Sequence, residues 1–474
     1  MPDPRPDTLD PSALPARVLV LSVRGEELDA TCGGLLRELR ARKAELRLCV
    51  LAGEFAPALP GVATTAEQLP PGELGACFDL VARLRRWIAE AAAELVVAPS
   101  PLERDPDRRA LARAACSAAD DGVERRLLFY SVDGPPGEVA LGAERFTVRR
   151  ARDAVAWSAA ELERADGGGP RTTAVVSTWN KLADVAANLD ALRAQTRPFA
   201  EIVVVDNASK DGTADFVRLR YPEVRLIVMP HDRFGACATF NLGFKASRTE
   251  LTAILDDDIV MPPNWNERAT ERMRREPATT AIVSTQVTEP GMPEGYLASP
   301  RHNSERYMST FRGCASLARA KALAEAGWYD ERLFIYGNER DLTCRLLNLG
   351  YRVLQYPGCG VFHKTPFGIK MGKRSLYYHA RNAWISMLKY APWSDLARMP
   401  WLVLTRVVLR GSKQEAEGAV ADATGTIGIG RSLRETPGAW WVLLKAAFSI
   451  LAHVPYCMRH RAPVRAPDFE LPIE

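Results

Sequence analysis

The chain has 474 residues, of which 47% are hydrophobic and 25% are charged. This is an ordinary globular composition, and the length predicts two or three domains. The formal net charge of +4 gives no reason to expect a nucleic-acid partner. The charge is uneven, however, because residues 364–474 hold 16 Lys and Arg against 8 Asp and Glu. This basic segment favours an acidic partner, such as a membrane surface or a phosphorylated acceptor.

Nine cysteines are scattered along the chain, and no Cys-x-x-Cys pair occurs. The odd number and the scatter argue against a disulfide framework or a zinc ribbon, and they fit a reducing compartment. Residues 1–15 are rich in Pro and Asp and lack the apolar core of a signal peptide. We therefore expect a disordered lead-in there and a cytoplasmic protein.

The first folded region, residues 16–158, alternates short apolar runs with helical patterns. This alternation predicts a Rossmann-like α/β domain with a parallel sheet. The expected strands are residues 17–21, 46–51 and 95–98, and the expected helices are residues 31–42 and 77–93.

Two segments of this domain resemble the PIG-L/LmbE-type zinc deacetylases. R-G-E-E at residues 24–27 stands where that family has His-Pro-Asp-Asp, and D-P-D-R at residues 105–108 stands where it has an H-x-D-H-type motif. Arginine does not ligate metals, because its guanidinium stays protonated. The resemblance therefore implies a degenerate domain that has kept the fold and lost the zinc site. A generic α/β domain is the alternative.

The segment D-G-G-G-P at residues 166–170 is the clearest linker in the chain, and it follows an expected connecting helix at residues 151–165. We set the linker region at residues 159–171. The strand–helix pattern then restarts. The expected strands are residues 173–178, 201–205, 224–229 and 251–255, and helices are expected at residues 182–194, after residue 213, and at residues 240–246.

Polar residues follow three of these strands. They are Thr178 and Asn180, Asp206 and Ser209, and the run Asp256-Asp257-Asp258. Ligands of a doubly wound sheet bind beyond the carboxyl ends of its strands. Adjacent carboxylates repel one another unless a cation compensates, and Mg²⁺ or Mn²⁺ binds through one or two carboxylates plus substrate phosphates. The pattern predicts a metal–diphosphate site, and a solvated acidic turn is the alternative.

Seven segments between residues 172 and 365 resemble, in order, the motifs of family 2 glycosyltransferases with the GT-A fold. They are S-T-W-N (177–180), V-V-V-D-N-A-S-K-D-G-T (203–213), N-L-G-F-K-A-S (241–247), L-D-D-D-I-V (255–260), the segment from F-R-G-C to D-E-R-L-F (311–334), Y-G-N-E-R-D-L-T-C-R-L-L-N-L-G-Y-R-V (336–353) and G-V-F-H-K (360–364). The resemblance implies a GT-A transferase domain over residues 172–374.

The resemblance also implies roles for the polar residues. Asp258, His363 and Asp256 would hold Mn²⁺ or Mg²⁺. The nucleotide-sugar would contact Thr178, Asn180, Asp206, Ser209, Asn241, Asp256 and Asp257. Alternatives stay open for three of them: His363 as a packing residue, Asn180 as a helix N-cap, and Asp257 pointing away from the site.

An inverting transfer needs a general base for the acceptor hydroxyl. The family's base is the Asp of a Glu-Asp pair, and Asn338-Glu339 stands at that pair, so the sequence departs from the pattern. Glu339 is the first candidate and Asp341 the second, although Asp341 can instead stabilise a helix N-terminus. The residues expected on the acceptor side are Arg312, Gly313 and Arg340.

Residues 375–474 are expected to form a helical C-terminal region. Residues 375–390 resemble the Y-Y-x-x-R-N helix of rhamnosyltransferase-like members. Residues 439–458 are almost wholly apolar apart from Lys445 and His453. They could lie in a membrane interface, pack on the catalytic domain or a homodimer partner, or span a bilayer.

The expected activity is inverting transfer of a sugar from a UDP- or dTDP-sugar to a hydroxyl of a cell-surface polysaccharide or glycolipid. The rhamnosyltransferase-like helix tilts the choice of donor toward dTDP-rhamnose. The expected setting is the cytoplasm, at the inner face of the membrane. A bifunctional deacetylase–transferase, a non-catalytic scaffold with a decayed transferase fold, and a nucleotidyltransferase are the alternatives.

Overall fold

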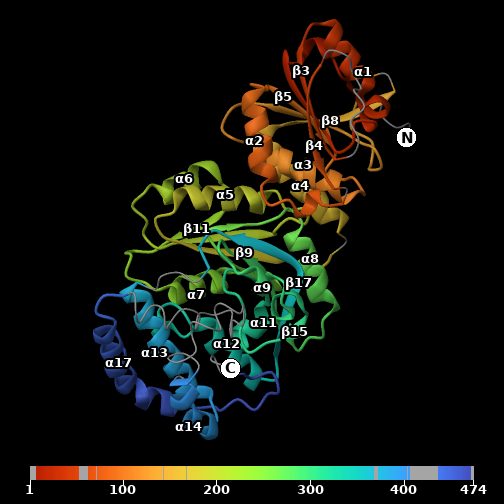
Figure 1. The fold of residues 1–474 in the computed structure, drawn as a ribbon. Coiled ribbons are helices and arrows are strands. Elements are labelled where there is room, and N and C mark those ends of the chain that lie inside the picture. The colour runs from red at the N-terminus through yellow and green to blue at the C-terminus, as the bar shows by residue number, and fades with distance from the viewer. Residues whose placement is uncertain are drawn as a thin grey trace. The chain divides into compact units, whose positions relative to one another are not determined.

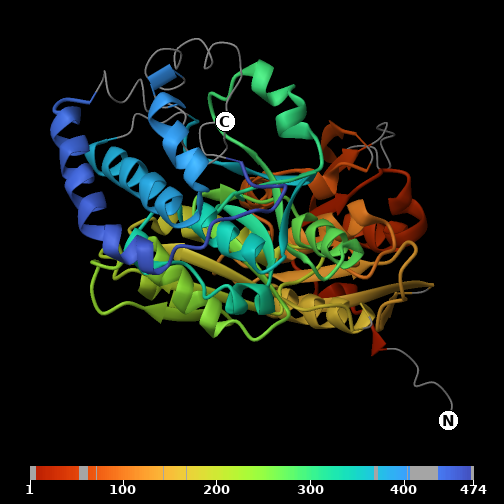
Figure 2. The ribbon, with the colours of Figure 1, turned by 90° about the horizontal axis from the view of Figure 1, so that it is seen from below.

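The computed structural model describes residues 7–52, 62–70, 72–141, 143–166, 168–367, 372–402, 404–405 and 436–470. The chain divides into two compact units, which are described separately (Figures 1 and 2). The first contains residues 1–169, 186–199 and 260–267, and the second contains residues 170–185, 200–259 and 268–474. The predicted domain boundaries stay predictions.

The first unit is built on an eight-stranded sheet with the order β1-β7-β8-β6-β5-β2-β3-β4. Its strands are β1 (Asp7–Thr8), β2 (Arg17–Ser22), β3 (Glu45–Ala52), β4 (Ala63–Leu69), β5 (Leu95–Pro99), β6 (Arg126–Tyr130), β7 (Val139–Leu141) and β8 (Glu144–Arg150). Its helices are α1 (Glu27–Ala41), α2 (Leu80–Glu90), α3 (Pro106–Ala119) and α4 (Ala151–Ala165).

The centre of this sheet agrees with the predicted parallel arrangement. β2 pairs in parallel with β3 and β5, and β5 pairs in parallel with β6. β8 is antiparallel to both β6 and β7. The expected lead-in also contributes structure, since β1 pairs with β7 and Pro11–Ala13 form a 3₁₀ turn.

The second unit holds a nine-stranded sheet with the order β11-β10-β9-β12-β16-β14-β17-β13, and β15 pairs with β17 beside this path. The strands are β9 (Thr172–Thr178), β10 (Glu201–Asp206), β11 (Arg225–Val228), β12 (Leu251–Asp256), β13 (Ile259–Val260), β14 (Thr280–Thr288), β15 (Arg306–Tyr307), β16 (Ala315–Arg319) and β17 (Arg352–His363). The helices between β9 and the C-terminal region are α5 (Leu182–Arg193), α6 (Thr213–Arg220), α7 (Ala236–Ala246), α8 (Trp265–Arg275), α9 (Glu294–Leu297), α10 (Pro300–Asn303), α11 (Ala320–Glu325) and α12 (Asn338–Asn348). Of these, α5 from residue 186 onward and α8 up to residue 267 belong to the first unit.

Four parallel strands bring the predicted polar strand ends to one edge. β9 lies between β10 and β12, and β10 also pairs with β11. In this register Thr178 is opposite Asp206, and Asp256 is opposite Ser177. β16 runs antiparallel to β12, so the sheet is mixed rather than purely parallel.

Helix α7 packs closely on this sheet. An ideal Cβ at Gly243 would lie only 2.2 Å from Val175 Cγ1 on β9, so a glycine is needed at the crossing. Phe240 and Phe244 from the same helix enter a core with Val203 and Ile254. This packing fixes the strands whose ends carry the polar residues.

The C-terminal region contributes the long helices α13 (Lys373–Tyr390) and α17 (Ala439–Arg459), together with α14 (Trp393–Leu402). Figures 1 and 2 both show α17 beside α13, at an edge of the second unit. The predicted fold class, two α/β units followed by helices, is confirmed.

Candidate functional site

The triple Asp run lies at the end of a central strand. β12 ends at Asp256, whose backbone N–H donates to the carbonyl oxygen of Cys314 at 3.1 Å. Asp257 and Asp258 form the turn into β13. The turn is also bound by the residue after β17, because Lys364 N–H donates to the Asp258 carbonyl at 3.0 Å. Backbone contacts from residues that flank β16 and β17 therefore hold the three carboxylates at one place.

His363, the last residue of β17, faces these carboxylates. Its Nε2 lies 3.1 Å from Asp258 Oδ1 and 3.9 Å from Asp256 Oδ2. In the part of the chain that the structure describes, Asp256, Asp258 and His363 are the group of at least three His, Cys, Asp or Glu side chains whose ligand atoms converge within 4.8 Å. Two carboxylates and an imidazole form a donor set that suits Mn²⁺, and the residues fit the predicted metal.

Glu289, just beyond the end of β14, holds the other side of this imidazole. Its Oε1 lies 2.9 Å from His363 Nδ1. A carboxylate at Nδ1 orients the ring and leaves Nε2 directed at Asp258. Burial opposes the charged form of His363, but the bonds to Asp258 and Glu289 raise its pKa to about 10. A metal ion at Nε2 would therefore have to displace a proton.

Lys181 supplies positive charge from the loop after β9. Its Nζ lies 2.9 Å from Asp258 Oδ2 and 3.1 Å from Asp257 Oδ1. Thr365 Oγ1 donates to the same Asp258 oxygen at 2.9 Å. Asp257 thus points toward Lys181, and Asp258 uses one oxygen for Lys181 and Thr365 and the other for His363.

The three carboxylates differ in their electrostatics. Burial raises the pKa of Asp256 to about 6, and the charges of Asp258 and Asp257 add to this effect while His363 opposes it. Burial also raises the pKa of Asp257. Burial acts in the same direction on Asp258, but the bonds from His363 and Lys181 outweigh it and hold the pKa of Asp258 well below its usual range. Of the three carboxylates, Asp258 therefore stays ionised down to the lowest pH.

The predicted donor residues at β9 and β10 contact one another. Ser209 N–H donates to Asp206 Oδ2 at 3.1 Å, and Asn180 N–H donates to Ser209 Oγ at 2.8 Å. Asn180 Oδ1 accepts from Lys210 N–H, whereas Asp211 accepts from the N–H of Leu182 at the start of α5. Asn180 therefore ties two loops together and does not cap this helix.

Asp206 and Thr178 are both buried at this edge. Asp206 Oδ1 has no hydrogen-bond donor among the described residues. An unsatisfied buried carboxylate oxygen is unfavourable, so this atom is suited to a donor from a ligand. Because the side chain is covered, a ligand reaches it only after neighbouring groups shift.

Asn241 differs from its predicted role. Its Nδ2 donates to Tyr329 O and Glu331 Oε1, and its Oδ1 accepts from Tyr329 N–H. These bonds use both ends of the amide. The buried side chain therefore stabilises the segment at residues 329–331 rather than facing a nucleotide.

The residues predicted on the acceptor side also have different surroundings in the structure. Arg340 is buried and donates to Ser309 Oγ and to the carbonyl of Glu470, so it anchors the C-terminal segment and is not available to an acceptor. Arg312 instead donates to Tyr296 Oη and interacts with the charge of Glu289, the residue that contacts His363. An ideal Cβ at Gly313 would lie 2.3 Å from Glu339 Oε1, so the glycine leaves space for that carboxylate.

The two base candidates have different surroundings. Glu339 is partly exposed, and Asn338 Nδ2 donates to its Oε1 at 2.9 Å. Burial and the charge of Asp256 raise the pKa of Glu339 to about 7. Asp341 is fully buried and forms ion pairs with Lys389 and Arg345. Glu339 therefore has the accessibility of a base, and Asp341 has the surroundings of a structural ion pair.

Asn382 on α13 holds the loop that precedes α12. Its Nδ2 contacts the carbonyl oxygens of Leu333, Ile335 and Tyr336 at 2.8–2.9 Å. Phe334 and Tyr336 adopt positive φ angles of 70° and 64° in this loop. Such conformations are unfavourable for non-glycine residues and persist only where surroundings impose them. Asn382 thus helps to position the start of α12, where Glu339 lies.

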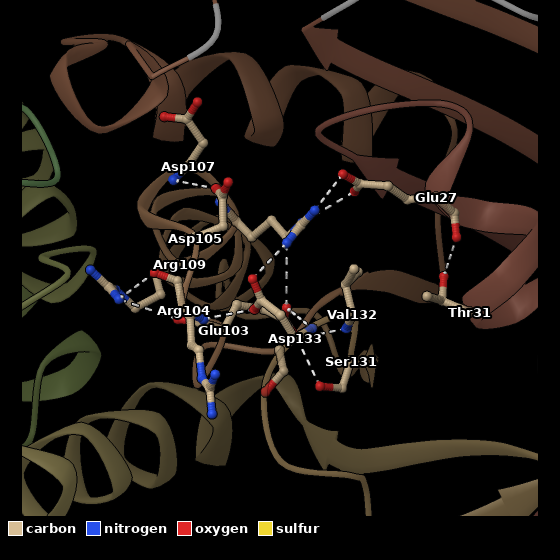
Figure 3. A network of polar contacts seen from close by, with 12 residues as sticks. Glu27, Thr31, Glu103, Arg104, Asp105, Asp107, Arg109, Ser131, Val132 and Asp133 are labelled. Carbon is tan, nitrogen blue, oxygen red and sulfur yellow. Dashed lines mark hydrogen bonds and ion pairs between the residues drawn. The ribbon is translucent and has the colours of Figure 1, made fainter.

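The first unit contains a second cluster of carboxylates, shown in Figure 3. The two segments compared with deacetylase motifs meet here, because Arg108 Nη2 lies 2.6 Å from Glu27 Oε1. The same guanidinium lies 3.0 Å from Asp133 and 3.9 Å from Glu103. Glu103 also accepts from Ser131 and from two backbone N–H groups. The cation at the centre of this cluster is an arginine.

The two aspartates of the D-P-D-R segment have structural roles. Asp105 caps α3 by accepting from the N–H groups of Asp107 and Arg108. Asp107 accepts from the N–H groups of Gly72 and Leu74. Both carboxylates are thereby committed to backbone donors.

Several contacts could not be foreseen from the sequence. Lys181, Glu289, Thr365 and Asn382 were not singled out as site residues, and each reaches its partner from a distant segment. Among these four residues, only Asn382 belongs to a recognised motif, the Y-Y-x-x-R-N segment.

Comparison with known proteins identifies the class of the second domain. Residues 173–326 match the family described as Glycosyl transferase family 2. The chain is 24% identical over 303 residues to the O-antigen biosynthesis protein RfbC of Myxococcus xanthus, covering 57% of this chain and 23% of that protein. It is 32% identical over 119 residues to the succinoglycan biosynthesis protein ExoO of Rhizobium meliloti, covering 25% of this chain and 34% of that protein.

Among solved structures, the chain is similar to the mannosyltransferase PcManGT from Pyrobaculum calidifontis in complex with GDP-Man and Mn²⁺. The sequence identity is 17%, the TM-score is 0.37, and the match covers 64% of this chain and 83% of that one. The chain spans less than two thirds of the length of either RfbC or ExoO. Residues 173–326 are a family 2 glycosyltransferase domain, and these matches assign no family to the N-terminal residues.

Replacing Glu289 tests its contact with His363. We expect Glu289→Gln to weaken Mn²⁺ binding by roughly 10-fold or more, because a neutral amide orients the imidazole less firmly and lowers its basicity. The measurement is Mn²⁺ titration followed by electron paramagnetic resonance, with UDP present. Glu294→Gln, an exposed carboxylate on nearby α9, is the matched control and should bind as wild type. Equal affinities in both variants would show that Glu289 does not position His363.

Proposed function

We propose that the protein is an inverting, metal-dependent glycosyltransferase. It moves a sugar from a UDP- or dTDP-sugar to a hydroxyl of a cell-surface polysaccharide or glycolipid. The observation that carries the proposal is the convergence of Asp256, Asp258 and His363 within 4.8 Å in a family 2 glycosyltransferase domain. RfbC and ExoO, by their names, act in O-antigen and succinoglycan biosynthesis, which supports a polysaccharide acceptor.

Asp258, His363 and Asp256 would hold Mn²⁺ or Mg²⁺. Bound there, the ion would neutralise the diphosphate of the donor and of the leaving nucleotide. Asp258 is the main ligand in this proposal because its carboxylate stays ionised. Thr178, Asp206 and Ser209 lie at neighbouring strand ends and would bind the base and ribose. The Y-Y-x-x-R-N helix supports dTDP-rhamnose among the donors.

Glu339 would act as the general base. Its carboxylate takes the proton of the acceptor hydroxyl while the acceptor oxygen forms a bond to the anomeric carbon. The bond from that carbon to the diphosphate breaks on the opposite face, so the configuration inverts. The absence of a side chain at Gly313 gives the Glu339 carboxylate its place, and a pKa of about 7 suits a base working near neutral pH.

The protein would work at the cytoplasmic face of a membrane. All nine cysteines are free thiols, which supports a reducing compartment.

A nucleotide-sugar screen tests the donor site. We expect UDP- or dTDP-sugars to raise the Tm of the wild type when Mn²⁺ is present, because ligand binding stabilises the folded state. Asp258→Asn should lose this Mn²⁺-dependent shift, whereas Asp215→Asn, an exposed α6 residue, should keep it. Stabilisation that needs no metal, or an unchanged response in the Asp258 variant, would contradict the proposed site.

The base assignment predicts a pH dependence. Because a base works when deprotonated, kcat/KM should fall about tenfold per pH unit below a pKa near 7. Glu339→Gln should lower kcat by roughly 10²–10⁴-fold. In the wild type, folding raises the pKa of the Glu339 carboxyl, so its ionised form destabilises the folded state as pH rises. At pH 8 Glu339→Gln should therefore be more stable than wild type by about 1–3 kcal/mol. Steady-state kinetics and urea unfolding measure both effects.

Asp341→Asn distinguishes the two candidates. This change leaves buried Lys389 with Asp330 alone and removes the partner of Arg345, so it should cost about 3 kcal/mol of stability. The folded fraction should keep kcat close to that of wild type. A large loss of kcat in Asp341→Asn, with little change in Glu339→Gln, would reverse the assignment.

We also propose that the N-terminal domain is a degenerate relative of the PIG-L/LmbE-type deacetylases without hydrolytic chemistry. The supporting contact is between Arg108 and Glu27, which stand at the two motif positions. A guanidinium compensates the carboxylates without metal, and neither arginine of the motifs ligates zinc.

Zinc analysis of the full chain tests this second proposal. The assay uses the Asp258→Asn variant, because this change removes a proposed principal ligand of the candidate metal site in the second unit. Any remaining stoichiometric zinc would then report on the N-terminal domain. We expect no stoichiometric zinc after dialysis, measured by inductively coupled plasma mass spectrometry. One zinc per chain, lost on changing Glu27 or Asp107, would favour a bifunctional enzyme.

A further inference from the structure

Helix α17 is apolar on all sides. Its 21 residues include two Lys or Arg, Lys445 and Arg459, and no acidic residue. By length and composition the helix could cross a membrane, yet only 11% of its most hydrophobic window is buried. A helix that is hydrophobic all round normally needs protein or lipid on every side.

One face of α17 is covered by α13. Ala439 packs near Leu376 at one end of the pair, and Cys457 Sγ contacts the Ile385 carbonyl at the other. Between them, Arg381 on α13 donates to Ser449 Oγ at 3.0 Å and approaches His453 Nε2 at 3.1 Å. The contacts run along the length of α17, so this face is held by protein.

The opposite face is exposed. Trp440 and Trp441 are 79% and 76% exposed, and Phe448 and Leu451 are each 65% exposed. Leu444 joins them, so the exposed side chains recur at intervals of three or four residues. They form one continuous stripe, about 16 Å long from Trp440 to Leu451. We call these five residues the α17 stripe.

The charges around the stripe indicate what covers it. Residues 436–467 contain four Lys or Arg and no Asp or Glu. Lys445 and Arg459 are exposed on α17, and Lys373 and Arg374 are exposed at the start of α13. Basic side chains beside an exposed apolar face match the combined chemistry of anionic lipid head groups and acyl chains.

Tryptophan also fits the interfacial region of a bilayer, because its ring is apolar and its N–H is polar. Two Trp lie at the start of α17. A third, Trp393, is exposed beside the other end of the helix, where Arg461 stacks on its ring at 3.9 Å.

We propose that the α17 stripe docks in the interface of an anionic membrane, with the helix parallel to the surface. A spanning orientation would require α17 to separate from α13 along its length and would bury Lys445. Interfacial docking keeps the α13 contacts and leaves Lys445 among the head groups.

This docking would bring the proposed catalytic base close to the membrane. α13 binds α17 through Arg381 and the loop before α12 through Asn382, so one helix separates the stripe from the loop that leads to Glu339. That arrangement suits a lipid-linked acceptor. The use of a lipid-linked acceptor rests on the proposed transferase function, whereas membrane docking of α17 does not.

Vesicle flotation of the full chain tests the docking directly. We expect wild type to float with vesicles of phosphatidylcholine and phosphatidylglycerol in equal parts, and to bind several-fold less to phosphatidylcholine alone, since anionic lipids attract its basic residues. Trp emission should shift to shorter wavelength on binding. Neither readout depends on nucleotide-sugar or on transfer, so failure of the proposed enzyme activity would be seen separately.

Two variants locate the contact. Trp441→Gln and Phe448→Gln should each weaken vesicle binding by roughly tenfold or more, because each removes an exposed aromatic group. Gln is a good helix former, and circular dichroism checks that α17 is kept. Leu219→Gln on α6, where the leucine is 80% exposed, is the matched control and should bind as wild type.

Four results would overturn the proposal. They are no flotation of wild type, flotation unchanged in both α17 variants, an oligomer that these variants dissociate in the absence of vesicle binding, and wild type that resists alkaline carbonate extraction from cell membranes. The third would assign the stripe to a second copy of this chain, and the fourth would indicate a spanning helix.

Discussion

Three consecutive carboxylates lie at the end of β12 and in the turn after it, and compensation of their mutual repulsion is the constraint on which the candidate site depends. Each compensating group comes from a different part of the chain: Lys181 follows β9, and His363 ends β17. Because β9 pairs with β12 directly, Lys181 lies beside the run through local register. His363 lies beside it because β13, which directly follows the run, is the neighbour of β17 in the sheet. Assembly of the site therefore requires two pairings, that of β9 with β12 and that of β13 with β17.

Sequence reasoning found the parts of this arrangement that depend on periodicity and strand order. The alternation of strands and helices predicts the sheet, and the rule that ligands bind at carboxyl ends of strands brings Thr178, Asp206 and Asp256 to one edge. Asp258 and His363 follow from the family resemblance and meet at 3.1 Å. These features follow from the order of strands and helices, which can be predicted from the pattern of residue types along the chain.

Other features depend on where a side chain points in the folded state. Asn241 and Arg340 have polar groups that suit a ligand, yet both are buried and bound to backbone. Glu339 and Asp341 lie two residues apart on α12, and only the fold separates a carboxylate beside Gly313 from one between Lys389 and Arg345. A sequence gives the residue type at these positions, whereas burial and partners, which decide the pKa and the role, come from segments far away in the chain.

The chain contains two clusters of carboxylates, and they are compensated in different ways. In the first unit, Arg108 contacts Glu27 and Asp133 with a guanidinium that is always charged and largely buried, so the cation is a fixed part of the fold. At the end of β12 the compensation is divided between Lys181, whose side chain is 39% exposed, and an imidazole. An exposed amine can turn away and an imidazole can lose its proton, whereas the guanidinium has neither freedom. The cations of the second cluster are therefore replaceable, as the proposed metal site requires, whereas the guanidinium of the first is not. Carboxylate clusters thus have a structural role in one unit and form a candidate catalytic site in the other, according to the cation that accompanies them.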